Sequence, residues 1–127
     1  MISGRVSIYR EAVVQIALHG AESQRADVES VVDTGFNGFL TLPRQIIDDL
    51  GFPFQTTSRA ELADGTIVEV DYFLGSLEWH GRIREVPIMC SDGDVLIGMS
   101  LLYGNRVTID VVRDGLVQID PMQDKRT

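Results

Sequence analysis

The stretch VVDTGFNG, residues 31–38, places an acidic side chain directly after a run of apolar, β-branched residues. Side chains alternate with a period of two from residue 27 to residue 32, and the alternation stops at Asp33. A carboxylate at that position loses solvation, which is costly without a purpose. Gly35 and Gly38 allow the backbone to turn sharply near a ligand, and Thr34 offers a hydroxyl group. The stretch is therefore either a candidate site or an ordinary Asp-Thr-Gly turn.

A second motif follows further along the chain. Residues 95–97 are wholly apolar and Gly98 comes directly after them, with a pair of leucines at positions 101 and 102. This pattern predicts a buried strand that enters a tight bend. Other aspartates also precede glycine, but polar or turn-forming neighbours surround each of them: Asp64, Asp92 and Asp114. Asp33 is the only acid that ends an apolar strand.

The rest of the chain has the spacing of an all-β domain, with short β-branched runs and turn residues between them. One helix is predicted over Arg44–Leu50, where Pro43 suits the first helical position and Gly51 supplies a left-handed stop. Asp64 and Gly65 suit a type I′ turn between two strands. The predicted strands cover residues 12–18, 27–32, 39–42, 59–62, 67–74, 77–79, 83–89, 95–97, 107–112 and 116–119.

Taken in order, the two motifs resemble the signature of the retropepsin-like aspartic proteases. In that family two apolar residues precede Asp-Thr/Ser-Gly, and an apolar-apolar-Gly motif later opens a short helix; here these are residues 31–35 and 96–98. The run from Asp33 to Pro43 looks like the small prokaryotic branch, and the resemblance covers residues 13–119. It implies a single all-β domain over residues 1–120, a closed or partly open β-barrel of this type with one short helix. Residues 121–127 look like a frayed tail.

The resemblance implies an aspartic endopeptidase in which Asp33 is catalytic, Thr34 and Gly35 support its loop, and Gly98 is structural. Such enzymes hold one water between two carboxyl groups that share a proton, because two like charges so close cannot both ionise. This chain has one such aspartate, so a twofold homodimer is expected to supply the second. Thr34 would bond across to the opposite loop. The open strand edges at either terminus are expected to pair between subunits.

The resemblance also indicates where a substrate would bind. The predicted hairpin tip lies between the two motifs, where this family has its substrate-covering flap; it consists of Ala63, Asp64, Gly65 and Thr66. A peptide or an unfolded protein would lie extended between Gly35 and this flap, bonded in the manner of a strand. The other function left open is a catalytically weak or inactive domain that serves dimerisation or peptide binding.

Three residues near the motifs depart from the viral members of the family. Phe36 and Asn37 stand where a small residue and a second acid are common there, and Met99 replaces a basic residue. The interlocking ion pairs of those enzymes are therefore not expected here. Phe36 and Phe39 are candidate pocket or interface residues, with core packing as the alternative for Phe39.

Composition narrows the classes of partner. The 127 residues carry a net charge of −8 without any basic run, which excludes nucleic acid as a partner. No apolar stretch reaches the ~18 residues that a membrane span needs, so no membrane partner is expected. The single Cys90 and the absence of a signal-like start indicate a cytoplasmic protein. His19 and His80 lack ligands at metal-binding spacing, and neither a metal nor a cofactor is expected.

Overall fold

The structure is a computed structural model that describes residues 1–123, and its fold is all-β, as the sequence predicts. These residues form ten strands and two short helices. Their bounds are β1 (Ile2–Val6), β2 (Ala12–His19), β3 (Arg25–Val32), β4 (Leu40–Leu42), α1 (Arg44–Leu50), β5 (Phe54–Glu61), β6 (Ile67–Trp79), β7 (Arg82–Cys90), β8 (Leu96–Ile97), α2 (Met99–Leu102), β9 (Asn105–Ile109) and β10 (Leu116–Pro121).

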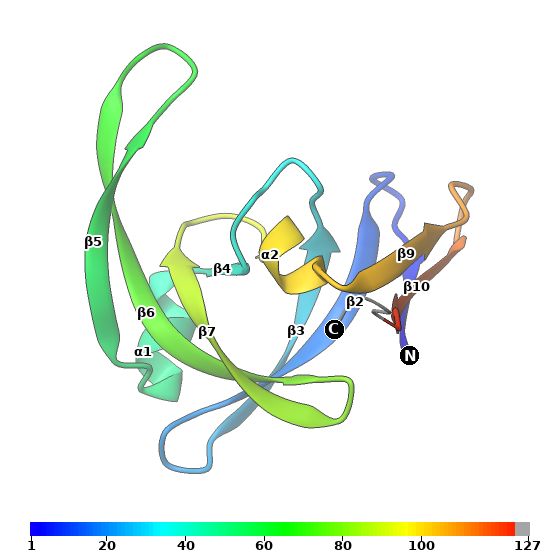
Figure 1. The fold of residues 1–127 in the computed structure, drawn as a ribbon, viewed down its shortest axis with the longest axis horizontal. Helices are drawn as coiled ribbons and strands as arrows, with labels where there is room; N and C mark the ends of the chain where they lie inside the picture. Colours follow the sequence, from blue (N-terminus) through cyan, green and yellow to red (C-terminus); the bar gives the residue numbers. More distant parts are fainter. Residues whose placement is uncertain (124–127) are drawn as a thin grey trace.

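All ten strands belong to one sheet, with the order β5-β6-β7-β4-β8-β3-β2-β1-β10-β9 (Figure 1). Two pairings are parallel, β3 with β8 and β4 with β7, and the others are antiparallel. Leu18 and His19 of β2 also pair with Leu77 and Ser76 of β6, so the sheet folds back on itself. The fully buried side chains at the centre are mostly aliphatic and include Ile16, Leu18, Leu40, Leu42, Leu77, Ile88, Ile97 and Ile119.

The predicted helix is present as α1, with Ile47 and Leu50 buried against the sheet. It ends at Gly51, which has the left-handed φ of 67° that was expected. Pro43 was expected as the first helical residue but lies just before the helix, with an extended ψ of 153°. A second helix, α2, follows Gly98 over four residues. One helix was expected in the domain, although the apolar-apolar-Gly motif opens a short helix at this position in the family that the sequence resembles.

Several strand boundaries differ from the prediction. The strand β1 was not predicted, β5 starts at Phe54 instead of Arg59, and β6 runs without a break where two strands were expected. The predicted type I′ turn at residues 64–65 is wrong, because only Gly65 has a positive φ there. A three-residue loop joins the strands instead, with Leu62 and Thr66 bonded across it.

The chain termini are paired within the chain, which contradicts the expected open edges. The strand β1 lies between β2 and β10, and β10 lies between β1 and β9, so the open edges in residues 1–123 are β5 and β9. Pro121 of the predicted tail is the last residue of β10, and residues 124–127 lie outside the described part of the chain. No helix in the described part is long and apolar enough to cross a membrane.

Candidate active site

The two sequence motifs lie side by side in the sheet. Val31 and Val32, at the end of β3, pair in parallel with Leu96 and Ile97 of β8. The backbone N–H of Asp33 donates to the carbonyl oxygen of Ile97 at 2.9 Å. On its other side, β8 pairs with β4 at Leu40. The strand β8 therefore holds both ends of the loop over residues 33–39.

Within that loop the Asp33 carboxylate is held on one side only. Its Oδ1 accepts the N–H of Gly35 at 2.9 Å, and the backbone carbonyl oxygen of Asp33 accepts the N–H of Phe36 at 3.2 Å. The side chain is half-buried, and its Oδ2 has no hydrogen-bond partner within residues 1–123. Thr34 and Gly35 are exposed, and the Thr34 hydroxyl makes no hydrogen bond in the same part of the chain. One carboxylate oxygen is thus fixed, and the other is free to bind water.

The first turn of α2 fixes the rest of this loop. The N–H groups of Gly98, Met99 and Ser100 donate to the carbonyl oxygens of Phe39, Phe36 and Gly38, at 3.0, 2.8 and 3.1 Å. The Ser100 hydroxyl also donates to the carbonyl oxygen of Asn37. These groups are free at the start of a helix, so the loop supplies the acceptors that the helix lacks. A Cβ atom on Gly98 would overlap the Gly38 carbonyl oxygen, so only glycine fits there.

A pocket of about 390 Å³ lies beside Asp33. Its walls come from β1, β2, β3, β8 and β9 and the loops at their ends: Val6, Arg10, Glu11, Ala12, Val31, Val32, Leu96, Ile109 and Val111. Glu11 is the only other carboxylate among them. Sequence analysis missed Arg10, Glu11 and Val111, since nothing in the local pattern shows that their loops meet the loop of Asp33. The left-handed φ of 62° at Arg10 is also invisible in the sequence.

A second, apolar pocket of about 240 Å³ lies on the other side of the loop. Phe36 and Phe39, the two candidate pocket residues, both line it. The Arg84 guanidinium lies 5.6 Å from the centre of the Phe39 ring. Phe39 also packs against the main core, so the pocket and core interpretations both describe it. The remaining walls are Gly38, Leu40, Tyr72, Pro87, Met89 and Ser100.

The predicted flap is the tip of the β5–β6 hairpin, which projects from the body of the domain (Figure 1). Ala63, Asp64, Gly65 and Thr66 are all exposed. The N–H of Thr66 donates to Asp64 Oδ1 at 2.9 Å, and hydrogen bonds from Thr66 hold the pKa of Asp64 below its usual value. No hydrogen bond in the described part of the chain joins this tip to residues 33–39. The structure therefore does not bring the flap and Asp33 together.

The other titratable candidates make no second site. His19 ends β2 and lies 3.6 Å from Glu78, and the His80 ring pairs with Asn105 at 2.7 Å. Among the residues that the structure describes, no group of three metal-ligating side chains comes together. Cys90 is half-buried at the end of β7, and burial raises the pKa of its thiol. A raised pKa lowers the thiolate fraction, which is unfavourable for a nucleophile.

We expect iodoacetamide to alkylate Cys90 at about pH 8 at least about tenfold more slowly in the folded protein than in the urea-denatured protein. Burial disfavours the thiolate, which is the reacting form, and shields the sulfur. The measurement is the rate of mass increase in the two states. Equal rates would show that the fold neither shields the Cys90 sulfur nor disfavours its thiolate.

No protein-family model matches the chain, and no curated protein matches it. What the chain can do chemically is therefore inferred from its own residues. A carboxylate with one free oxygen can act as a general base toward water. Hydrolysis of a peptide bond also needs an acid to protonate the carbonyl oxygen, and Asp33 alone cannot fill both roles at once.

Proposed function

We propose that this protein is an aspartic endopeptidase of the retropepsin-like type and that it acts as a homodimer. The observation that supports this most directly is the setting of Asp33 at the junction of the two motifs. Its backbone is bonded to Ile97, and its carboxylate is fixed at Oδ1 and open at Oδ2. The other aspartates that precede glycine are all exposed in turns, and they are Asp64, Asp92 and Asp114. None of these offers a comparable second acid.

The strand pairing supports the finer assignment of a closed or partly open barrel. The pairings β6-β7-β4-β8-β3-β2 run in sequence, and the pairing of β2 with β6 returns to the start. Asp33 follows β3 within this circuit. A carboxylate mounted at the end of a strand with paired neighbours keeps a fixed position, which catalysis requires.

In the proposed mechanism two copies of Asp33 hold one water between them. One carboxylate takes a proton from the water as it attacks the peptide carbonyl, and the protonated partner donates to the carbonyl oxygen. Because two like charges at close range repel, one of the two carboxyl groups has to carry a proton, and this proton is the one that the reaction donates. Activity should therefore decline as the pH rises enough to remove that proton.

The test is cleavage of an unfolded protein and of a peptide library by the full chain, from about pH 4 to about pH 8. A statine-type mimic of the tetrahedral transition state should inhibit the reaction, because such mimics bind more tightly than substrates. Peptide binding without cleavage at any pH would reject the peptidase and favour the dimerisation or peptide-binding module.

We expect Glu11→Gln to keep peptidase activity within about threefold of wild type. Glu11 lines the Asp33 pocket, so it is the one residue in that pocket that could form a pair with Asp33 inside a single chain. If the second acid comes from another copy, removal of the Glu11 charge leaves the pair intact. A loss as large as that of an Asp33 variant would instead indicate an Asp33–Glu11 pair and an active monomer.

A further inference from the structure

We propose that two copies of the chain dock through the loops over residues 7–10 and 110–113. This inference rests on the proposed function, because it names the surface that would bring two copies of Asp33 together. We call these residues the two-loop surface. It carries four apolar side chains with exposed fractions of 64–77%: Ile8 at 76%, Tyr9 at 77%, Val111 at 76% and Val112 at 64%.

The two-loop surface is continuous with the candidate active site. It encloses a hollow of about 610 Å³ whose walls are Val6, Ser7, Ile8, Arg10, Val111, Val112 and Arg113. Val6, Arg10 and Val111 also line the pocket beside Asp33. The β1–β2, β3–β4 and β9–β10 loops all lie on the upper side of the domain in Figure 1, to the right of the β5–β6 hairpin. A partner seated on the two-loop surface would therefore border Asp33.

Backbone hydrogen bonds hold the exposed apolar side chains in place. The Ser7 hydroxyl accepts the N–H groups of Tyr9 and Glu11, and the Ser7 carbonyl oxygen accepts the N–H of Arg10. Arg10 has a left-handed φ, which is uncommon for a residue with a side chain and tends to be kept where function requires it. This loop thus presents Ile8 and Tyr9 to solvent on a defined backbone.

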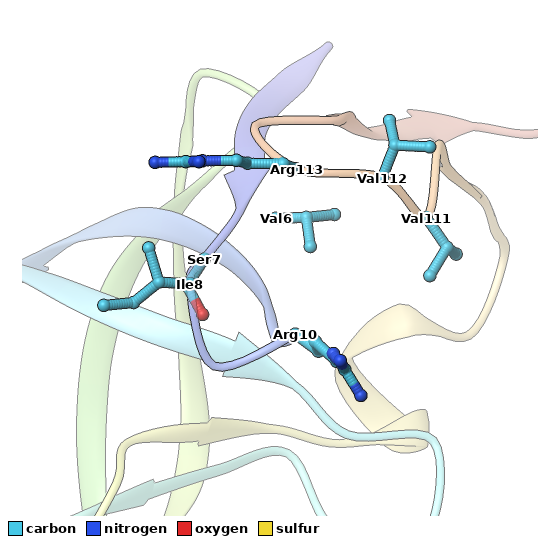
Figure 2. A pocket seen from close by; sticks show the side chains of 7 residues that line it. All are labelled: Val6, Ser7, Ile8, Arg10, Val111, Val112 and Arg113. Atoms are coloured by element: carbon cyan, nitrogen blue, oxygen red, sulfur yellow. The ribbon is translucent and has the colours of Figure 1, made fainter.

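The second loop is fixed to the end of β1, the strand that leads into the first loop. The N–H of Gly115 donates to the Val112 carbonyl oxygen at 2.9 Å, and the N–H of Val6 at the end of β1 donates to the Gly115 carbonyl oxygen at 2.9 Å. Figure 2 shows Val6, Val111 and Val112 around one hollow, while the side chains of Arg10 and Arg113 point in different directions at its rim. Apolar groups therefore form the walls, and charged groups form the rim, as in protein interfaces.

Charge favours a second copy of this chain as the occupant. A twofold interface brings each surface against itself, so its charged groups can pair only if the surface carries both signs of charge. Arg10 and Arg113 supply positive charge, and the exposed Asp110 on the second loop and Asp114 directly after it supply negative charge. Within residues 1–123 none of these four side chains forms an ion pair. Two chains of net charge −8 would repel over most of their surfaces, and these residues offer reciprocal pairs where they meet.

The test compares Ile8→Glu and Val112→Glu with Ile83→Glu. Ile83 is also exposed, at 56%, but it lies beside the β6–β7 turn at the opposite end of the domain (Figure 1). Neither Ile8 nor Val112 lines the Asp33 pocket. Sedimentation velocity over a range of concentrations gives the dimer dissociation constant, and circular dichroism confirms that each variant folds.

We expect the wild type to dimerise and each two-loop variant to raise the dissociation constant by about 100-fold or more, with no change for Ile83→Glu. Peptidase activity should fall with the dimer fraction and recover at high protein concentration. A wild type that stays monomeric, or two-loop variants that dimerise as tightly as the control, would overturn the surface assignment. If the wild type dimerises but cleaves no peptide, and the two-loop variants lose the dimer, the surface assignment is supported and the proposed function is rejected.

Discussion

Asp33→Asn is expected to lower peptide hydrolysis by about 1,000-fold or more, because it removes the general base and the general acid from both copies at once. Asparagine has nearly the same shape and can still accept the Gly35 N–H with its Oδ1 atom, so the loop should keep its conformation. The measurement is the initial rate of peptide cleavage, with circular dichroism and sedimentation as checks on the fold and the dimer. Cleavage at the wild-type rate would reject the catalytic role of Asp33.

Mixing wild-type and Asp33→Asn chains separates a shared site from two independent sites. If both copies of Asp33 are needed and the chains exchange freely, about one quarter of the dimers in an equal mixture carry two intact aspartates. The mixture should then retain about one quarter of the activity of pure wild type at the same total protein concentration. If each chain acts alone, the mixture should retain about one half. The Glu11→Gln variant should show no such loss in the same experiment.

The sequence predicted the parts of the site that follow from the local pattern of apolar and polar residues. Asp33 ends an apolar run because Val31 and Val32, on opposite faces of β3 at its end, are both at least half-buried, and the apolar triplet before Gly98 marks β8 as a mostly buried strand. Periodicity detects this kind of burial directly. The parallel pairing of the two strands joins residues far apart in the sequence, and only the order of the two motifs hinted at it.

Other features depend on tertiary contacts that local pattern does not encode. Gly75 and Ser76 interrupt an apolar run, so the sequence predicts a break there, yet both lie inside β6. A Cβ on Gly75 would lie 2.6 Å from Ile88 Cγ1, so close packing is what this glycine provides. The residues of β5 are nearly all exposed, which leaves no alternation to detect. The loops over residues 7–10 and 110–113 meet only because β1 and β10 pair.

The turn chemistry shows a similar limit. Asp64-Gly65 suits a type I′ turn by composition, but Glu61 pairs with Ile67 and the Leu62 N–H donates to the Thr66 carbonyl oxygen, which leaves a loop of three residues. His80 and Gly81 have the two positive φ values that a type I′ turn requires, 52° and 78°. The register of the flanking strands therefore decides the turn, and composition only permits it.

Gly98→Ala is expected to lower the free energy of unfolding by about 2–4 kcal/mol. The backbone at Gly98 has a φ of −100°, which any residue adopts, so the cost is one of space. An added Cβ would overlap the Gly38 carbonyl oxygen and lie 2.6 Å from Phe36 Cδ2. The Gly38 carbonyl cannot retreat without losing its bond from the Ser100 N–H. Urea denaturation followed by circular dichroism measures the effect.

Gly65→Ala is the matched control, because Gly65 has a φ of 88° and nothing within 4 Å of an added Cβ. Its cost is conformational only, about 1 kcal/mol, so the difference between the two variants isolates the overlap at Gly98. Gly98 follows Ile97, whose carbonyl oxygen accepts the Asp33 N–H. Displacement of Gly98 should therefore also move the carboxylate and weaken hydrolysis in the fraction that stays folded. Equal destabilisation by the two substitutions would show that the loop yields to the added methyl group and that its packing does not position Asp33.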